Sequence, residues 1–171
     1  MNLQSTDFEL FDVPARFAQD AAQLDARWKA LQRQLHPDRF AAEGAAAQRV
    51  AMQWSARVNE AFQRLKTPQL RAAYLCELHG AAIAAESNTA MPAEFLMRQI
   101  ALREAIDEAD TDLAVERVDQ ELNTERRATL SKIEHQIDVA QDWSGAAQSV
   151  RALMFLERLA ADVERRRATL A

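Results

Sequence analysis

Apolar residues recur at helical spacing in the first quarter of the chain. The stripe consists of Leu24, Trp28, Leu31 and Leu35. Residues three and four positions apart share one face of a helix, so this stripe predicts an amphipathic helix. Proline lacks an amide donor and disfavours the helical conformation of the residue before it. We therefore expect the helix to end before Pro37 and the tripeptide His36-Pro37-Asp38 to lie in a loop.

A longer apolar stripe follows, from about residue 45 to residue 66. Its members are Ala47, Val50, Trp54, Val58, Ala61 and Leu65. Thr67-Pro68 should end this helix, and the two striped helices can then pack antiparallel. A short helix near residues 8–10, ended by Pro14, should precede this pair, and another over residues 69–78 should follow it.

Residues 79–90 lack a consistent stripe and are rich in turn-forming residues, namely Gly80, Ser87, Asn88 and Thr89. We place a domain boundary there. The sequence thus predicts a first domain over residues 1–78, a linker over residues 79–90 and a second domain over residues 91–171.

Three further helices are expected in the second domain. Pro92 suits the first turn of a helix that runs to about Ala109, and Asp110-Thr111-Asp112 can cap the next one. The stripe of that second helix is Val115, Val118, Leu122, Ile133, Ile137 and Ala140. Trp143-Ser144-Gly145 should break the chain before a last helix from Ala146 to about Leu170, with Leu153, Leu156, Ala160 and Val163 inward. Three such helices pack as a bundle.

Composition supports an all-α fold. Only 3 glycines and 4 prolines accompany 49% hydrophobic and 27% charged residues in a chain of 171, which suits long helices better than sheets. The single cysteine cannot form an internal disulfide, and the N-terminus lacks the basic start and apolar stretch of a secretory signal. The sequence contains no run of about 18 apolar residues, so it predicts no membrane span. We therefore expect a cytoplasmic protein that is not a membrane protein.

The charges differ between the two parts of the chain. Residues 1–78 hold 10 Lys and Arg against 9 Asp and Glu, whereas the remaining residues hold 11 against 17. An acidic second domain repels phosphate backbones, so we expect no nucleic acid partner.

The tripeptide His36-Pro37-Asp38 is the first candidate for function. By itself it reads as an interhelical turn, in which proline stops one helix and aspartate caps the next segment. Its surroundings favour a functional role as well, because Lys29 and Arg33 point away from the apolar stripe and leave a basic face beside the tripeptide. Ordinary solvated charge is the alternative explanation of that face.

The helix after the tripeptide ends in Val58-Asn59-Glu60-Ala61-Phe62-Gln63-Arg64-Leu65, followed by Pro68 and Arg71-Ala72-Ala73-Tyr74. With the tripeptide, this strongly resembles a J-domain. The resemblance implies that Asp38 contacts an arginine of a DnaK-type chaperone's nucleotide-binding domain, while His36 and Pro37 fix the loop. The implied chaperone-contact residues are His36, Pro37, Asp38, Arg27, Lys29, Arg33 and Arg39.

A second apolar strip lies on the helix that begins near Pro92. Phe95, Leu102, Ile106 and Ala109 share the sector expected to face the bundle core. The strip formed by Leu96, Met97 and Ile100 projects elsewhere, alongside Glu104 and Glu108. An exposed apolar strip usually marks an interface. The alternative is that the strip packs against the first domain or the linker.

The runs Phe95-Leu96-Met97, Leu102-Arg103-Glu104 and Val150-Arg151-Ala152-Leu153-Met154-Phe155-Leu156 resemble the HscB family of iron-sulfur J-type co-chaperones, across nearly the whole chain. The resemblance implies that the second domain holds the cluster scaffold IscU, while the J-domain recruits the chaperone HscA. The implied scaffold-binding residues are Leu96, Met97, Ile100, Glu104, Glu108 and Phe155. Ala101 departs from the family pattern, in which an acidic residue is common.

An enzyme or a metalloprotein is not expected. Cys76 and His79 are one turn apart, but structural zinc needs four ligands, and a buried cysteine with a surface histidine explains the pair better. One thiol cannot hold an iron-sulfur cluster, and neither a phosphate loop nor a paired nucleophile is evident. We therefore expect no cofactor. Two alternatives remain: a J-type co-chaperone for another client, and a helical scaffold with a degenerate J-domain.

Overall fold

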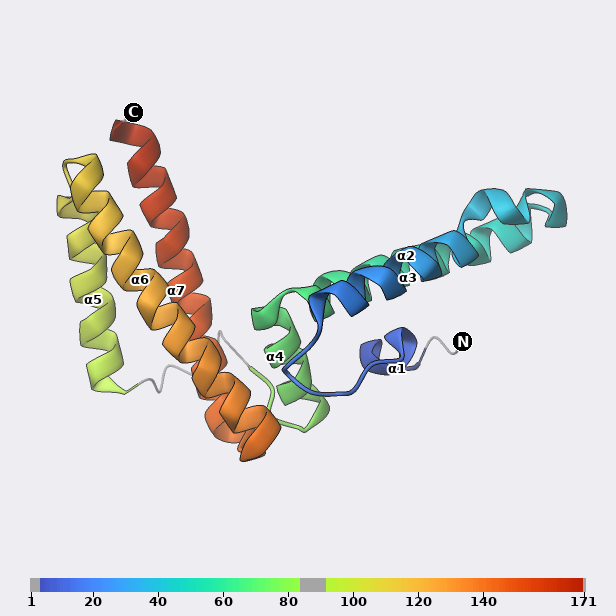
Figure 1. Cartoon of the computed structure of the whole chain (residues 1–171), viewed down its shortest axis with the longest axis horizontal. Helices are drawn as coiled ribbons and strands as arrows, with labels where there is room; N and C mark the ends of the chain where they lie inside the picture. The colour runs from blue at the N-terminus through green and yellow to red at the C-terminus, as the bar shows by residue number, and fades with distance from the viewer. Residues whose placement is uncertain (1–3, 84–91, 171) are drawn as a thin grey trace. The chain divides into compact units, whose positions relative to one another are not determined.

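The computed structural model describes residues 4–83 and 92–170. Every regular element within these residues is a helix, which confirms the expected all-α class (Figure 1). The internal contacts divide the chain into two compact units, Met1–Leu75 and Cys76–Ala171. The boundary between the units falls inside α4 (Pro68–Leu78).

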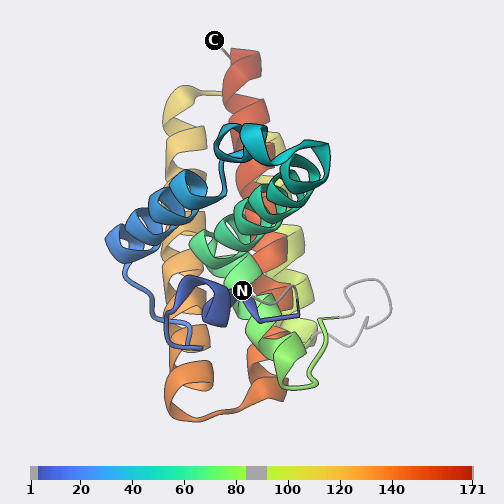
Figure 2. The ribbon, with the colours of Figure 1, turned by 90° about the vertical axis from the view of Figure 1, so that its right-hand side faces the viewer.

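The first unit is built around an antiparallel pair of helices. Its elements are α1 (Asp7–Phe11), α2 (Ala21–Leu35), the 3-10 helix η1 (Pro37–Glu43), α3 (Ala45–Lys66) and the first part of α4. The carboxylate of Asp20 caps α2 by accepting hydrogen bonds from the amides of Ala22 and Gln23. Figure 2 shows η1 bridging the ends of α2 and α3.

Aromatic stacking and a shared amide hold α2 against α3. The rings of Trp28 and Phe62 stack with their centroids 4.9 Å apart. Asn59 Oδ1 accepts hydrogen bonds from Trp28 Nε1 at 2.9 Å and from Gln32 Nε2 at 2.6 Å. The core beneath these contacts includes Leu24, Val58, Ala61 and Leu65, all at most 2% exposed. The two apolar stripes therefore meet as the sequence predicts.

A buried carboxylate ties α1 to α3. Asp7 is fully buried, with Oδ1 lying 2.6 Å from Arg57 Nη2 and Oδ2 lying 3.0 Å from Arg64 Nη1. The backbone amide of Asp7 donates a hydrogen bond to the hydroxyl of Tyr74 on α4 at 3.1 Å. Because a buried charge is costly unless it is paired, these arginines are the reason that an aspartate can occupy this position.

Two expectations for the first unit were wrong. The tripeptide does not lie in an irregular loop, because Pro37 and Asp38 begin the 3-10 helix η1, for which His36 is the N-cap. Proline suits the first position of a helix, where the missing amide donor costs nothing. Val50 is 53% exposed instead of inward, because Ala51, at 3%, takes the inward position in that turn of α3.

The second unit holds three long helices. They are α5 (Ala93–Glu108), α6 (Asp112–Glu134), which continues into a π-helical turn, η2 (His135–Val139), and α7 (Trp143–Leu170). Both views show α6 and α7 side by side (Figures 1 and 2). Ion pairs join Arg126 to Glu157 at 2.7 Å and Arg167 to Glu116 at 3.4 Å, so α6 and α7 run antiparallel. The three helices form the expected bundle.

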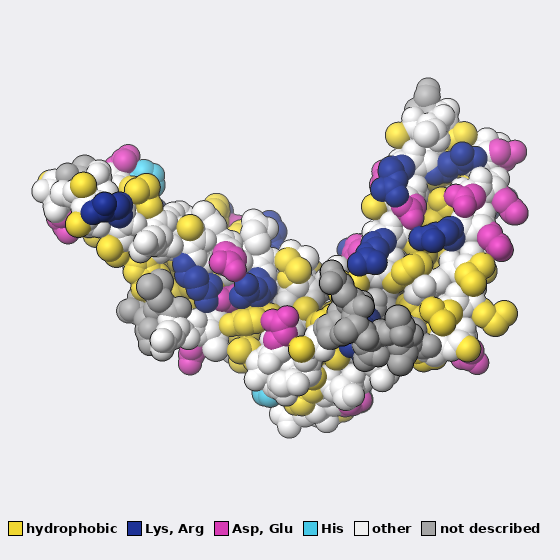
Figure 3. Space-filling model, turned by 180° about the vertical axis from the view of Figure 1, so that it is seen from behind, with side chains coloured by type: hydrophobic (Ala, Val, Ile, Leu, Met, Phe, Trp, Pro, Cys, Tyr) yellow, Lys and Arg dark blue, Asp and Glu magenta, His cyan; other side chains and the backbone are white. Residues whose placement is uncertain are grey.

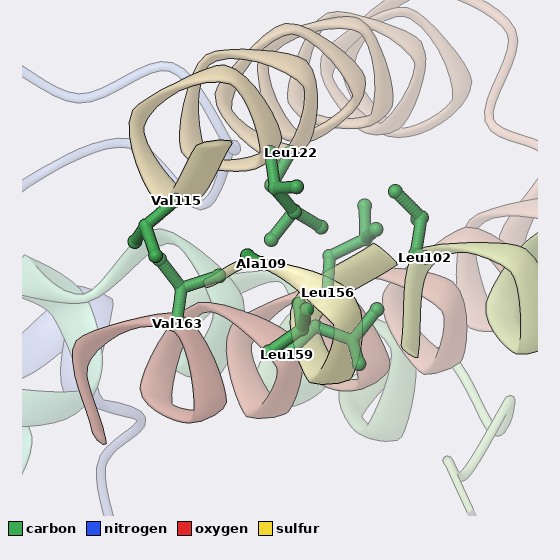
Figure 4. Packing of buried hydrophobic residues seen from close by; sticks show 9 residues of the cluster. Leu102, Ala109, Val115, Leu122, Leu156, Leu159 and Val163 are labelled. Carbon is green, nitrogen blue, oxygen red and sulfur yellow. The ribbon is translucent and has the colours of Figure 1, made fainter. Parts of the chain in front are cut away.

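Aliphatic side chains from all three helices fill the core of this bundle (Figure 4). The buried cluster is Leu102, Ile106, Ala109, Val115, Val118, Leu122, Leu156, Leu159 and Val163. Most of the predicted inward residues are among them. Burial of a leucine or valine side chain contributes about 1.5 to 3 kcal/mol, so this cluster contributes substantially to the stability of the bundle.

The junction between η2 and α7 differs from the sequence expectation. Trp143-Ser144-Gly145 forms the first turn of α7 and is not a break. Asp142 begins the helix instead, since its Oδ1 accepts a hydrogen bond from the amide of Gly145 at 2.9 Å. The chain reverses at Gln141, which has a left-handed φ of 51°. Ala140 lies at this reversal and is exposed, contrary to its predicted inward place.

Part of the expected linker packs within the second unit. The ring of His79 stacks on Trp143 with the centroids 3.7 Å apart. Ile83 is buried, and its carbonyl accepts a hydrogen bond from Arg151 Nη1 at 3.1 Å. The remaining linker residues, 84–90, lie outside the described residues.

Candidate functional site

The tripeptide His36-Pro37-Asp38 stands where α2 meets η1. The amide of Asp38 donates a hydrogen bond to His36 Nδ1 at 3.3 Å, and Asp38 Oδ2 lies 3.6 Å from the same nitrogen. The side chain of Asp38 is 89% exposed and that of His36 is 59% exposed. This arrangement presents a carboxylate to solvent on a turn that is fixed by proline and by the imidazole.

The four basic residues predicted to contact a chaperone differ in their pairing. Arg27 Nη2 lies 2.6 Å from a carboxylate oxygen of Asp12. Lys29 pairs with Asp25, one turn earlier on α2, at 2.7 Å. The positive charges of these two side chains are therefore partly neutralised by local carboxylates.

Arg33 and Arg39 lie nearer to the tripeptide. Arg39 donates a hydrogen bond from Nη1 to the backbone carbonyl of Arg33 at 3.1 Å. The exposed guanidinium of Arg33 has no ion pair within the described part of the chain. The structure thus brings Arg33, Arg39 and the tripeptide together, whereas Arg27 lies about 13 Å along the helix from His36 at 1.5 Å per residue.

The predicted scaffold-binding strip is exposed on α5. Leu96, Met97 and Ile100 have exposed fractions of 43%, 72% and 58%. In Figure 3, hydrophobic side chains gather at the right-hand edge of the molecule, over the half of α5 that begins at Ala93. These exposed fractions show that, among the described residues of the second unit, the strip is not part of the buried bundle core.

Phe155 reaches the same surface from α7. Its ring meets that of Phe95 edge-on, with the centroids 6.1 Å apart, and it also packs on the bundle core. Phe155, Ile100 and Glu104 line one shallow hollow. Glu108 is exposed one turn beyond Glu104 on α5 and does not line that hollow.

Two arginines near the strip were missed by the sequence reasoning. Arg103 lines the hollow with Phe155. Arg98 follows Met97 and forms ion pairs with Glu121 and Glu125 of α6. The helical stripe identifies apolar faces only, and no spacing along the chain reveals which acids of another helix meet Arg98.

The structure confirms the assignment of Cys76 as buried and of His79 as a surface residue. Burial raises the pKa of the Cys76 thiol to about 11, which leaves a protonated and unreactive side chain at neutral pH. The described residues contain no group of three or more potential metal ligands among His, Cys, Asp and Glu. Nor does any helix among them have the length and apolar character needed to cross a bilayer.

Comparison with known proteins identifies the family. The family model for the HSCB C-terminal oligomerisation domain matches residues 91–164. The co-chaperone protein HscB homolog of Burkholderia thailandensis is 49% identical over 166 residues, covering 95% of this chain and 94% of the relative. That of Bordetella petrii is 48% identical over 157 residues, covering 91% and 92%.

Similar solved structures point to the same family. Chaperone HscB from Vibrio cholerae has a TM-score of 0.85 and 33% identity, covering 98% of this chain and all of its own. The human co-chaperone HscB, at 22% identity, shares the fold with a TM-score of 0.94, over 99% of this chain and 86% of its own. The expected J-domain followed by a helical C-terminal domain is thereby confirmed. The chain belongs to the HscB family of co-chaperones.

Proposed function

We propose that this protein stimulates the ATPase of the DnaK-type chaperone HscA through His36-Pro37-Asp38 and delivers to it the iron-sulfur scaffold IscU, bound to its C-terminal bundle. The observation that carries the proposal is the Asp38 carboxylate, which is 89% exposed on a turn that Pro37 fixes and in which the backbone amide of Asp38 donates a hydrogen bond to His36 Nδ1. A carboxylate held in this way can form a charge-assisted pair with an arginine of the chaperone.

Stimulation of hydrolysis requires a contact that differs between the nucleotide states of the chaperone. A ligand shifts an equilibrium only by its difference in affinity for the two states. A carboxylate on a fixed backbone meets this need better than one on a mobile loop, because a fixed acceptor position is matched by one arrangement of the arginine and not by another. The chemistry of ATP cleavage remains with the chaperone.

The scaffold contact rests on the apolar strip of α5. Leu96, Met97 and Ile100 offer three neighbouring apolar side chains, with Glu104 on the adjoining turn. Apolar anchors surrounded by polar residues commonly supply most of the binding energy of an interface. A scaffold surface with a complementary apolar patch and basic rim fits this strip.

Phosphate release measured with HscA-type chaperone and ATP tests the proposal. Titration of the full-length protein should accelerate release, and addition of the scaffold IscU should accelerate it further. Acceleration by the protein with no response to IscU would point to a J-type co-chaperone for another client. No acceleration at all would point to a helical scaffold with a degenerate J-domain.

The pairing of the basic residues sharpens the test. Because Arg33 forms no ion pair among the described residues, Arg33→Glu should reduce stimulation at least tenfold. Arg27→Glu, which alters a residue already paired with Asp12, is the matched control and should reduce stimulation less. Equal losses for the two variants would show that net charge, and not the position of Arg33, matters.

A further inference from the structure

The first half of α5 buries less of its surface than the second half of the same helix. None of its side chains from Ala93 to Ala101 is buried, and the first buried residue is Leu102, at 1% exposure. The strip of Leu96, Met97 and Ile100 lies in this half. A helix segment without a buried face gains little from packing and depends on other contacts for its position.

Two contacts anchor this half of α5 in the described structure. One is the edge-on packing of Phe95 against Phe155 of α7. The other is the ion pairing of Arg98 with both Glu121 and Glu125 of α6, in which Arg98 Nε donates to Glu125 Oε1 at 2.5 Å. The hydrogen bonds that Arg98 donates to Glu121 and Glu125 raise the pKa of its guanidinium above the usual range.

The two glutamates depend on Arg98 as much as it depends on them. Glu121 and Glu125 are one helical turn apart on α6, where like charges repel each other. Arg98 reaches both and neutralises that repulsion. Removal of Arg98 therefore does more than delete one attraction, because it leaves a repelling pair of carboxylates facing α5.

We infer that Arg98 is a positioning residue for partner binding: its ion pairs with Glu121 and Glu125 hold the first half of α5 on α6, so that Leu96, Met97 and Ile100 form one fixed surface. This inference rests on the proposed scaffold contact. A surface that is ordered before binding loses less conformational entropy on association. We call these ion pairs of Arg98 with Glu121 and Glu125 the clamp. The clamp should strengthen scaffold binding although none of its three residues contacts the scaffold.

Direct contact of Arg98 with the scaffold is the competing explanation, because Arg98 follows Met97 on the same helix. The glutamates separate the two explanations, since they lie on α6 and pair with Arg98. Glu121→Gln with Glu125→Gln releases the clamp but leaves Arg98 in place. A positioning role predicts the same defect from either side of the clamp.

The experiment uses the full-length protein in four forms: wild type, Arg98→Gln, the double glutamine variant, and all three changes together. Amide hydrogen exchange is followed without scaffold, and affinity for IscU is measured by calorimetry. Exchange over residues 93–101 should accelerate about fivefold in each variant, with that of α7 unchanged. Affinity should fall about five- to tenfold in each, and no further when the changes are combined.

A charge exchange and a control complete the design. Arg98→Glu combined with Glu121→Arg and Glu125→Arg restores the attraction and should return affinity to within about twofold of wild type. Arg117→Gln changes an exposed arginine of α6 that has no ion pair among the described residues, and should leave both readouts unchanged.

Three results would overturn the inference while the proposed function stands: unchanged exchange over residues 93–101, normal affinity of Arg98→Gln, or loss of affinity in Arg98→Gln but not in the double glutamine variant. The last result would make Arg98 a direct contact. Failure of the wild-type protein to bind IscU would instead overturn the proposed scaffold contact, and the role of Arg98 with it.

Discussion

The amide of Asp38 donates a hydrogen bond to Nδ1 of His36, which links the first and last residues of the tripeptide across Pro37. The bond orients the backbone of Asp38 and leaves its carboxylate exposed. In the proposed function, histidine and aspartate therefore have different tasks: His36 fixes the turn, and the Asp38 carboxylate contacts the chaperone.

Asp38→Asn keeps the shape of the side chain and removes its charge. Loss of a charge-assisted contact costs about 1.5 to 3 kcal/mol, so stimulation of the chaperone ATPase should fall by at least tenfold. Helicity, measured by circular dichroism, and affinity for IscU should not change, since the exposed carboxylate supports neither. His36→Gln should also reduce stimulation, because it removes the acceptor that fixes the turn. Near-normal stimulation by both variants would refute the proposed role of the tripeptide.

Asp7→Asn should destabilise the first unit strongly. The change leaves Arg57 and Arg64 facing a neutral amide in a fully buried position, and breaking a buried ion pair costs about 3 to 5 kcal/mol. Urea unfolding followed by tryptophan fluorescence measures the loss. The control is Asp12→Asn, whose side chain is 82% exposed beside Arg27 and which should change stability by less than about 1 kcal/mol.

Most of the fold follows from the helical periodicity of apolar residues and from the residues that end helices. The limits of α3 coincide with those predicted, because Thr67-Pro68 ends the helix where its stripe ends. The start of α7 was misplaced because glycine and serine suggest a turn, whereas the hydrogen bond from the Gly145 amide to Asp142 stabilises a helical one. Val50 was predicted to point inward in place of Ala51, because periodicity alone does not show which of two adjacent residues in a turn faces the core.

The features of the two candidate sites also differ in whether the sequence predicts them. The exposure of Leu96, Met97 and Ile100 follows from their angle to the core stripe, which any helical wheel reveals. The ion pairs of Arg27, Lys29 and Arg98 could not be predicted with equal success. Lys29 and Asp25 lie one turn apart on a single helix, so their pair is visible in the sequence. The partners of Arg98 come from another helix and become neighbours only when the bundle packs.

The Cys76 thiol should make stability depend on pH in the alkaline range. Its folded pKa is raised to about 11, above the usual value of about 8.5 for an unfolded chain. The folded state therefore holds this proton more tightly, so its stabilising contribution is complete below about pH 8.5 and is lost as the pH rises through 11. Urea midpoints between pH 8 and pH 10.5 should fall more steeply for wild type than for Cys76→Ala. Equal slopes would contradict burial of the thiol.

The triple variant Leu96→Ala, Met97→Ala, Ile100→Ala should weaken IscU binding at least tenfold, because it removes the three exposed apolar anchors of the strip. Alanine favours helices, and none of the three side chains is buried, so the melting temperature should stay close to that of wild type. The matched control is Leu113→Ala, which removes an apolar side chain that is 64% exposed at the start of α6 and should leave affinity unchanged. ATPase stimulation measured without scaffold should also be unchanged, since in the proposed function that readout depends on Asp38. A triple variant that melts much earlier and still binds IscU would assign the strip to the fold instead of the interface.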